Sequence, residues 1–395
     1  MSIAATDTTT APTADPVAAL FPRQQALLTS LADQDRYRRL IPRAGHDFSS
    51  NDYLGLAASD EMRAAAMAAL QRCVPVGAGG SRLLRGNDSE HQQLEEEAAA
   101  FFGSEAALFM GGGFNANVAI FATLPQRGDL VLYDDLIHAS VREGMRLGRA
   151  ETQNFAHNDV ADAARVISDW RAAGGIGQVW IAVEAVYSMD GDLAPLTELM
   201  ALADASGGVL VVDEAHATGL FGPQGRGLAY DIAHRPNVIS LHTCGKALGA
   251  SGALICAPKV LIDMLINKGR IFIFATAPSP LNAALVRASL ALLQQDASRI
   301  DRAWEVIDHA HAEAARLCGL TGFACQILPV ITGGDGRTMQ LASDLQALGY
   351  DIRGIRPPTV PAGTSRLRVS ITLNTSKSVV TEMFTDLAQV LEQRP

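Results

Sequence analysis

The sequence has little of what marks nucleic-acid-binding, membrane or disulfide-stabilised proteins. Charged residues make up only 19% of its 395 residues, aromatic residues 6%, and the net charge is −10. This acidic balance argues against nucleic acid as the main partner. No stretch approaches the roughly 18 consecutive apolar residues of a membrane span. The five cysteines are odd in number and lack C-x-x-C spacing, so we expect reduced thiols rather than disulfides or a zinc site.

We expect no secretory signal at the N-terminus. Residues 1–15 are rich in alanine and threonine, with neither a cationic start nor an apolar stretch. We therefore expect a disordered tail and a cytoplasmic protein. The apolar content of 48% indicates a substantial core. The length predicts one large and one smaller unit: an N-terminal tail and helical arm (1–50), a large domain (51–282) and a small C-terminal domain (283–395).

Short apolar runs alternate with helix-length segments in the large domain, which predicts an α/β fold with a mostly parallel sheet. The strands are expected at residues 106–109, 130–133, 179–183, 209–212, 238–241 and 253–256. Helices are expected at 20–43, 115–124, 160–172 and 196–205. The C-terminal unit is a smaller α/β domain, with helices at 282–293, 302–317, 338–348 and 378–392 and strands near 324–331 and 366–372.

Polar or glycine-rich segments follow these strands, and open α/β sheets bind ligands at the carboxyl ends of their strands. The first strand leads into Met110-Gly-Gly-Gly-Phe-Asn115 and a helix. Free N–H groups at such a helix start can bind phosphate, although the glycines are equally consistent with a tight turn. The segment is not G-x-G-x-x-G, and a P-loop is absent because Ala247 follows Lys246.

Two further strand ends carry single polar side chains of uncertain role. His138 follows the strand at 130–133, and its imidazole is either structural or stacked on a flat cofactor ring. Ser188 follows the strand at 179–183, and its hydroxyl either caps a turn or donates to a cofactor oxygen. Neither residue is informative alone.

Val211-Val-Asp-Glu-Ala-His216 places a carboxylate at the end of an apolar run, where burial is expected. A buried carboxylate needs a cation or hydrogen-bond donors. Asp213 therefore pairs with a protonated pyridine, or else with nearby backbone or Arg226. A metal site built on Asp213 and His216 lacks a third ligand at convincing spacing.

Lys246 is the most informative residue. It lies in Thr243-Cys-Gly-Lys-Ala-Leu-Gly249, between small residues and directly after a buried strand. Burial lowers the pKa of a lysine and makes it both a nucleophile and a base. A Schiff-base lysine together with a buried carboxylate is what a pyridine aldehyde cofactor requires. Lys246 and Asp213 thus indicate pyridoxal 5'-phosphate (PLP), with a purely structural lysine as the alternative.

From about Arg36 to the C-terminus, the chain resembles the α-oxoamine synthases, PLP enzymes of fold type I. The resemblance is carried by Ser49-Ser-Asn-Asp-Tyr-Leu-Gly-Leu56, Gly79-Gly-Ser-Arg82, Gly113-Phe-x-Ala-Asn117, His138-Ala-Ser140, Ser188-Met-Asp-Gly191, Asp213-Glu-Ala-His216 and Thr243-x-Gly-Lys246. It implies a PLP-dependent acyltransferase with the large and small domains of that fold. Ala217 and Cys244 depart from the family pattern at positions where the family varies.

The resemblance implies specific roles around the cofactor. Lys246 carries PLP as a Schiff base, and Asp213 pairs with the pyridine nitrogen. His138 stacks on the ring and faces the substrate. His216 and Ser188 contact the side of the phenolic oxygen. The catalytic residues are then Lys246, His138 and Asp213.

The phosphate group and the partner subunit complete the expected cofactor site. By the same resemblance, the backbone of Gly113 and Phe114 and the side chain of Thr243 hold the phosphate. Thr276 reaches the phosphate of the neighbouring subunit's cofactor. A homodimer with active sites at the interface follows from that assignment.

The C-terminal segment Ile355-Arg-Pro-Pro-Thr-Val-Pro-Ala-Gly-Thr364, followed by Arg366-Leu-Arg368, is similar to the family branch that condenses L-alanine with a pimeloyl thioester on the route to biotin. The resemblance implies that Arg368 and Asn51 bind the amino-acid carboxylate, while Arg38 and Thr359 contact the acyl donor.

Three alternatives stay open. Glycine C-acetyltransferase, 5-aminolevulinate synthase and serine palmitoyltransferase share the earlier motifs but match the C-terminal segment less well. A catalytically silent subunit that binds PLP or acyl-CoA is disfavoured because Lys246 is intact. A metal-dependent hydrolase built on Asp213, His216 and His138 is the most distant alternative.

Overall fold

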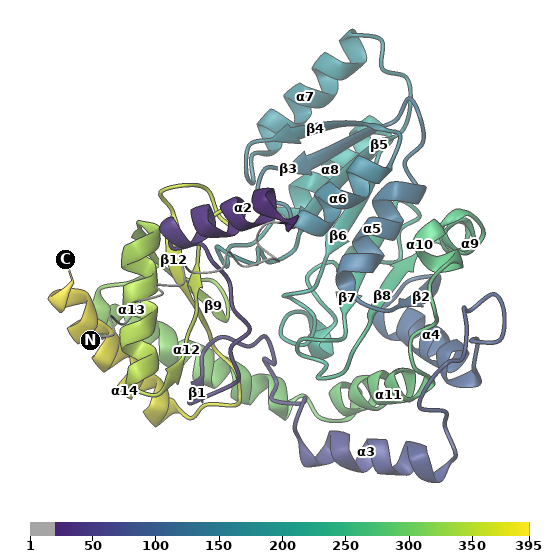
Figure 1. Cartoon of the computed structure of the whole chain (residues 1–395). Helices are drawn as coiled ribbons and strands as arrows, with labels where there is room; N and C mark the ends of the chain where they lie inside the picture. The colour runs from purple at the N-terminus through teal and green to yellow at the C-terminus, as the bar shows by residue number, and fades with distance from the viewer. Residues whose placement is uncertain (1–19, 395) are drawn as a thin grey trace, which may run out of the picture.

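The computed structural model describes residues 20–394 and contains a seven-stranded sheet and a smaller three-stranded sheet (Figure 1). The large sheet has the order β2-β8-β7-β6-β5-β3-β4. Its strands are β2 (Ala106–Met110), β3 (Leu130–Asp134), β4 (Glu151–Phe155), β5 (Val179–Glu184), β6 (Val209–Asp213), β7 (Val238–Thr243) and β8 (Ala253–Ala257). In this sheet β8 runs antiparallel to both β2 and β7, and the other pairs are parallel. The predicted mostly parallel α/β fold is confirmed.

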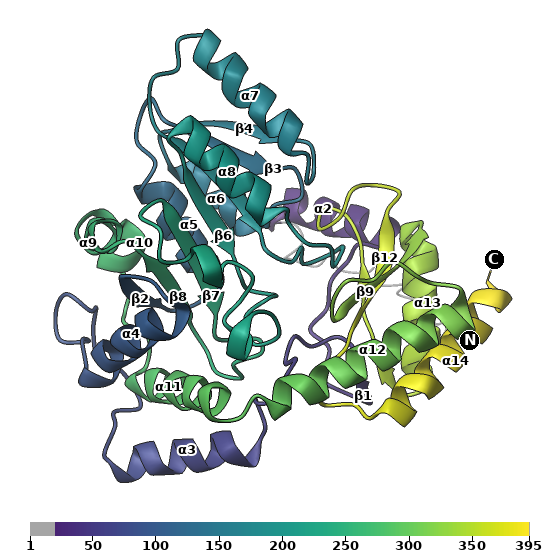
Figure 2. The same ribbon diagram turned by 180° about the vertical axis from the view of Figure 1, so that it is seen from behind.

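Helices cover both faces of the large sheet, which explains why its central strands are apolar throughout rather than alternating. Leu130 and Leu132 pack in one cluster with α7 (Val160–Ala172) and α8 (Leu196–Ser206). Val131, between them, packs on the opposite face with α5 (Gly113–Thr123), α6 (Ala139–Leu147) and α9 (Lys259–Lys268). Figures 1 and 2 show these two helical layers in turn, with α5 and α6 in front in one view and α8 in front in the other.

The smaller unit is an antiparallel sheet of order β11-β12-β9 covered by helices. Its elements are β9 (Ile327–Gly333), β11 (Gly354–Ile355), β12 (Ser365–Ser370), α12 (Ser298–Cys318), α13 (Asp335–Ala347) and α14 (Lys377–Gln393). An N-terminal strand, β1 (His46–Asp47), pairs in parallel with β10 (Tyr350–Asp351) of this unit. The chain before residue 50 is therefore tied to the C-terminal sheet.

The remaining elements join the two sheets or lie at their edges. They are α3 (Asp60–Gln71), α4 (Ser89–Phe102), α10 (Arg270–Ile273), α11 (Pro280–Gln295) and the short 3-10 turns η1 (Pro223–Gly225) and η2 (Tyr230–Ile232). Figure 2 shows α11 running beneath the large sheet toward α12, with α3 alongside. The division at residues 50 and 282 stays a prediction.

The N-terminal helix is shorter than expected. The sequence pattern predicts a helix over 20–43, but α2 spans only Pro22–Asp33. Asp35 has a φ of 56°, outside the helical region, and this turns the chain away. The Arg36 Nε atom then lies 2.7 Å from Asp335 Oδ2, which ties the following segment to the small unit. The tail predicted for residues 1–15 lies outside the described residues.

Among residues 20–394, no helix has both the length and the apolar character needed to cross a membrane. All five cysteines are unpaired, and Cys244, Cys256 and Cys325 are buried.

Candidate active site

The strands of the large sheet extend one or two residues beyond their apolar runs, and those last residues surround a cavity of about 390 Å³. Glu184 ends β5, Asp213 ends β6 and Thr243 ends β7. The cavity brings together the predicted residues Asn51, Gly113, Phe114, His138, Asp213, His216, Thr243 and Lys246. The rule that ligands bind at the carboxyl ends of strands predicted that these residues would lie together, and they line one cavity.

Lys246 is held by a chain of hydrogen bonds. Its Nζ atom lies 2.8 Å from Nε2 of His216, and Nδ1 of His216 lies 2.6 Å from the hydroxyl of Tyr53. That hydroxyl donates to Oδ1 of Asn51 at 3.0 Å, and Nη2 of Arg368 donates to the same oxygen at 3.0 Å. This chain of contacts therefore links Lys246, in the loop after β7, to Arg368 on β12.

This chain fixes the tautomer of His216. A guanidinium only donates, so Oδ1 of Asn51 is an acceptor and the single Tyr53 proton is directed to it. The Tyr53 oxygen must then accept from Nδ1–H of His216, which leaves Nε2 free to accept from Lys246. Burial, with Lys246 and Arg368 adding positive charge, lowers the pKa of His216 well below its usual value and keeps it neutral.

Asp213 is buried and accepts two hydrogen bonds. Nδ2 of Asn117 donates to Oδ2 at 2.7 Å, and the backbone N–H of Ala215 donates to Oδ1 at 3.0 Å. Arg226, considered as a partner from the sequence, instead contacts Tyr230 and Gln224. Within residues 20–394 the carboxylate therefore has neutral donors but no ion-pair partner, as is expected of a group that pairs with a protonated pyridine.

The N-terminus of α5 lies at the edge of the cavity and fits a phosphate group. It begins at Gly113, two residues before the predicted start, with no side-chain cap and no acidic residue in its first turn. Its free N–H groups favour an anion. A Cβ atom at Gly113 would lie 2.5 Å from Cγ2 of Thr243, so glycine is needed for this close approach.

Two groups that line the cavity, Lys246 and Glu184, have shifted pKa values. Burial lowers the pKa of Lys246 to about 8, although the charges of Asp213 and Glu184 act in the opposite direction. Burial and the charge of Asp213 raise the pKa of Glu184 to about 8. Oε2 of Glu184 accepts from the backbone N–H of Ser188 at 3.1 Å, whereas Oε1 is buried without a partner. A bound group with a hydrogen-bond donor or acceptor would satisfy that atom.

His138 and Ser188 approach the cavity from two loops. His138 caps the start of α6, and its Nδ1 atom lies 2.7 Å from Oγ of Ser140. Burial lowers the pKa of His138, so it is neutral near pH 7. Ser188 is buried beside the cavity rather than in its wall, and its backbone carbonyl accepts from Nε of Arg368 at 2.6 Å.

Arg368 is 6% exposed and forms no ion pair within residues 20–394. It donates to the Ser188 carbonyl, to Ser370 Oγ at 2.7 Å and to Asn51 Oδ1 at 3.0 Å. Burying a cation without an anion is costly. Arg368 does not line the cavity itself, but it is hydrogen-bonded to Asn51, which does.

Three predicted residues lie away from this cavity. Thr276 is exposed and lines a separate cavity with Phe109 and Asn115. Arg38 and Thr359 are also exposed. Both lie near Arg356, whose carbonyl accepts from the Thr359 N–H at 3.1 Å and whose pKa is lowered by burial and by the charge of Arg38.

Sequence reasoning missed several residues that the structure places in or beside the cavity: Tyr53, Asn117, Ser140 and Glu184. Tyr53, Asn117 and Ser140 lie within motifs that carried the family resemblance, but their hydrogen-bond partners are distant in sequence. Glu184 directly follows the apolar run predicted as a strand at 179–183, and no role was predicted for it. Its register opposite Asp213 could have identified it.

The chain matches the family model described as aminotransferase class I and II over residues 45–385. It is 40% identical over 355 residues to an 8-amino-7-oxononanoate synthase of Anaeromyxobacter dehalogenans, covering 89% of this chain and 88% of the relative. The corresponding protein of Chromobacterium violaceum is 42% identical over 328 residues, covering 82% and 83%.

Solved structures show the same fold. A Sphingomonas wittichii serine palmitoyltransferase has a TM-score of 0.85 at 26% identity, covering 97% of this chain and 100% of its own. A serine palmitoyltransferase of S. paucimobilis, solved with PLP and myriocin bound, has a TM-score of 0.84 at 25% identity, with coverage of 96% and 99%. A Francisella tularensis 8-amino-7-oxononanoate synthase, at 24% identity and a TM-score of 0.73, covers 88% and 98% and supports the fold alone.

The chain therefore belongs to the aminotransferase class I and II family. Within it, the sequence relatives place the chain among the 8-amino-7-oxononanoate synthases. The resemblance noted from the motifs is confirmed, and so is the fold type. The site fits the cofactor expected for this family, because a lysine, an uncompensated carboxylate and an anion-binding helix start face one cavity.

Proposed function

We propose that the protein is an 8-amino-7-oxononanoate synthase that condenses L-alanine with a pimeloyl thioester, releasing carbon dioxide and the thiol, in biotin biosynthesis. The cofactor is PLP. The carrying observation is the Lys246 cavity with the buried, unpaired Arg368 beside it, in a chain 40% identical to proteins of that name over 89% of its length. The geometry of the cavity supports an amino acid as the substrate, and the sequence relatives support this particular reaction.

The residues of the cavity would hold PLP. Lys246 would bind the aldehyde carbon until the amino acid displaces it and frees its amine, and the N–H groups of Gly113 and Phe114, with Thr243, would hold the phosphate. Asp213 would keep the pyridine nitrogen protonated. When bound, PLP supplies an electron-withdrawing ring that accommodates the charge developing on the amino-acid Cα.

The protein groups then bind and orient the amino acid. Arg368 and Asn51 receive its carboxylate, which neutralises the buried guanidinium. Fixing the carboxylate fixes the direction of the Cα–H bond, an effect of positioning that lowers the barrier to proton removal.

Lys246 is the base that removes the Cα proton. Its pKa of about 8 lies close to neutral pH, where a general base works best. Its hydrogen bond to Nε2 of His216 directs the amine into the cavity. After the acyl group has transferred and carbon dioxide has left, the same nitrogen returns a proton to Cα.

Arg38 and Thr359 are proposed to contact the acyl donor. Both are exposed around Arg356, next to a hollow of about 350 Å³ lined by Tyr37, Arg39 and Arg356. These cations suit the phosphates of coenzyme A or an acidic carrier protein.

The homodimer is proposed from Thr276. It is exposed and lies outside the Lys246 cavity, so a role at a cofactor phosphate requires a second chain. The exposed side chains of Leu84, Phe114 and Phe274 provide apolar surface for association. Sedimentation across a concentration range should give a dimer mass for the active protein, and an active monomer would contradict the assignment.

The function is tested by product identification. The purified protein would be incubated with alanine, glycine or serine and with acetyl, succinyl, palmitoyl or pimeloyl thioesters. Alanine and the pimeloyl thioester should give the highest kcat/KM. Discrimination against glycine depends on one methyl group, worth about 1–3 kcal/mol, so slow glycine turnover is compatible with the proposal. Preferred use of glycine with acetyl-CoA would instead indicate glycine C-acetyltransferase. Binding of PLP without turnover of any pair would indicate a silent subunit. We also propose a cytoplasmic location, consistent with the unpaired cysteines.

A further inference from the structure

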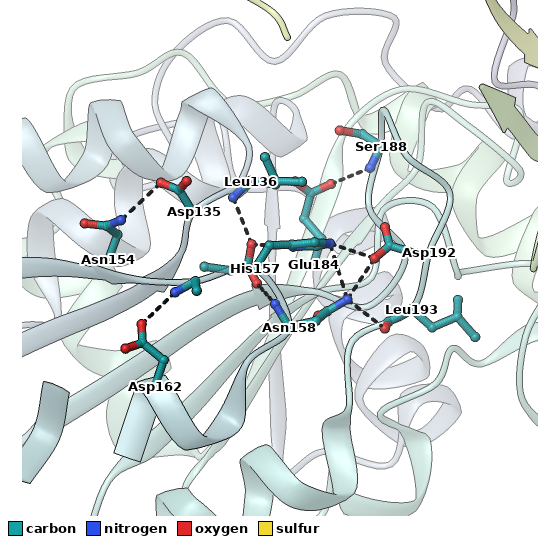
Figure 3. A network of polar contacts seen from close by, with 12 residues as sticks. Asp135, Leu136, Asn154, His157, Asn158, Asp162, Glu184, Ser188, Asp192 and Leu193 are labelled. Atoms are coloured by element: carbon teal, nitrogen blue, oxygen red, sulfur yellow. Dashed lines mark hydrogen bonds and ion pairs between the residues drawn. The ribbon is translucent and has the colours of Figure 1, made fainter. Parts of the chain in front are cut away.

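His157 lies between two carboxylates outside the Lys246 cavity. Its Nδ1 atom is 2.8 Å from Oδ1 of Asp134, and its Nε2 atom is 2.6 Å from Oδ2 of Asp192. The Asp134 side chain is fully buried, whereas that of Asp192 is 41% exposed. Figure 3 shows the imidazole beside Asp192 and Asn158. We call Asp134, His157 and Asp192 the carboxylate clamp.

The imidazole of the clamp must carry both ring protons. A carboxylate accepts hydrogen bonds, so each ring nitrogen has to donate. Burial lowers the pKa of His157, but the hydrogen bonds that its ring donates to Asp134 and Asp192 outweigh this effect and raise the pKa to about 10. The titratable groups facing the ring are these two carboxyls and Tyr187, whose ring lies edge-on to it at 4.5 Å. The clamp is therefore a charged unit at neutral pH.

Asn158 strengthens the clamp from the same loop. Its backbone N–H donates to Oδ2 of Asp134 at 2.8 Å, and its side-chain Nδ2 donates to Oδ2 of Asp192 at 2.8 Å and to the carbonyl of Leu193 at 3.1 Å (Figure 3). Its φ of 56° allows both sets of contacts from a single residue. The adjacent residues His157 and Asn158 therefore both donate hydrogen bonds to Asp134 and Asp192.

The clamp joins the two segments that bring His138 and Ser188 to the cavity. Asp134 ends β3, four residues before His138, and its Oδ1 atom also accepts from the N–H of Leu136 at 2.8 Å. Asp192 lies four residues after Ser188, in the turn where its carbonyl accepts from the N–H of Tyr187 at 3.0 Å. The loop after β4 carries His157 and links the two segments.

We propose that His157 is a positioning residue for the cofactor site: its imidazolium, held by Asp134 and Asp192, sets the relative placement of His138 and Ser188 against bound PLP. None of the three clamp residues lines the Lys246 cavity, so the clamp acts through the loops it joins. The inference rests on the proposed roles of His138 at the ring and Ser188 at the phenolic side. Removing the imidazolium leaves a buried carboxylate facing a second one, which drives the segments apart.

The test uses the full chain as His157→Gln, with Arg165→Gln as the matched control. Arg165 also bridges two carboxylates, Asp162 and Asp169, but on the exposed surface of α7. Both variants should keep the far-ultraviolet circular dichroism of the parent protein. The visible circular dichroism of bound PLP, the PLP dissociation constant, and kcat and KM for alanine are then compared.

For His157→Gln we expect weaker PLP binding by about tenfold or more, a reduced visible dichroic band and a kcat lowered about 100-fold, as expected for a misplacement of about 1 Å. Adding Asp192→Asn to this variant should restore part of the loss, because it removes the repelling charge. Arg165→Gln should resemble the parent. PLP affinity, dichroism and kcat in His157→Gln equal to those of Arg165→Gln would overturn the proposal.

A second variant covers the case in which His157→Gln fails to fold. Asp192→Asn changes a partly exposed residue and keeps the imidazole paired with Asp134. It should fold and show a smaller shift in the visible dichroic band, while an unchanged band and PLP affinity would overturn the proposal. The dichroism and PLP titration need no substrate. If the parent binds PLP but does not turn over alanine, the proposed function fails and the clamp is still tested.

Discussion

Glu184 and Asp213 lie opposite each other at the carboxyl ends of the neighbouring parallel strands β5 and β6. Both are buried, and both face Lys246 across one cavity. Asp213 has two hydrogen-bond donors, whereas Oε1 of Glu184 has none. Two adjacent carboxylates cannot both ionise freely in such a place, so the raised pKa of Glu184 assigns it the proton. The end of β6 then carries the carboxylate of Asp213, and the end of β5 carries Glu184 as a hydrogen-bond donor.

We expect Glu184→Gln to keep PLP binding and most activity, because an amide reproduces a neutral acid that donates a hydrogen bond. Glu184→Ala should lose both in larger part, since it leaves the Ser188 N–H without its acceptor. PLP titration and kcat/KM for the two variants check this. A Glu184→Gln variant as impaired as Glu184→Ala would show that the ionised carboxylate is needed.

The same group makes the stability of the PLP-free protein depend on pH. The pKa of Glu184 rises from 4.5 in the unfolded chain to about 8 in the fold. The folded state therefore binds the proton more tightly, and its contribution is complete below pH 4.5 and lost as pH rises through about 8. Thermal unfolding from pH 5 to pH 9 should show less loss in Glu184→Gln than in the parent. Parallel curves would contradict the prediction.

Lys246→Ala should abolish covalent attachment of PLP. Borohydride reduction and peptide mass mapping of the parent protein should place a pyridoxyl group on Lys246, and the variant should carry none. Lys268→Ala, at the end of α9, is a matched control that should leave the labelling unchanged. Labelling of another lysine in the parent would remove the central assignment.

Arg368→Gln should raise the KM for alanine more than it changes PLP affinity. The guanidinium has no carboxylate partner among the residues that the structure describes, so we expect its charge to be available to the substrate. Losing one partner of a buried charge pair costs about 2–5 kcal/mol, which corresponds to a fall in kcat/KM of at least about 30-fold. Arg353→Gln, which breaks a partly exposed pair with Asp351, should change little. Equal effects of the two variants would exclude the carboxylate role.

The elements that could be predicted from the sequence are those with a local signal. The apolar runs of β3, β5, β6 and β7 are buried on both faces and stand out against their flanks. β4 was missed because its residues, Glu-Thr-Gln-Asn-Phe, are mostly exposed at the sheet edge and show no apolar run. The prediction made α2 too long because no local pattern indicates that Arg36 pairs with Asp335, which is 299 residues away in the sequence.

The residues of the candidate site also divide into those with a local sequence signal and those that depend on distant contacts. Lys246, Asp213 and Gly113 could be recognised because each lies at the end of a buried strand or three residues beyond it. The contacts that orient them join distant residues: Tyr53 to His216 across 163 positions and Asn117 to Asp213 across 96. Such pairs depend on the sheet order, with β6 between β5 and β7, and no local pattern encodes that order. Thr276 was assigned to a partner subunit by resemblance, and a single chain leaves that assignment a prediction.

The final prediction concerns the pH at which Lys246 reacts. Burial lowers its pKa from 10.5 to about 8, so the free amine, which is the nucleophile, predominates above about pH 8 rather than above pH 10.5. The rate at which PLP combines with the PLP-free protein should therefore rise up to about pH 8 and then level off. Stopped-flow absorbance measures this rate, with a free alkylamine under the same conditions as the control for the titration of PLP itself. The charge of Asp213 favours the ammonium form, so Asp213→Asn should move the midpoint to lower pH. Glu184 is protonated below about pH 8, so Glu184→Gln should move the midpoint less. A rate that still climbs between pH 9 and pH 10 would show that Lys246 behaves as an exposed lysine and that burial does not prepare it for reaction.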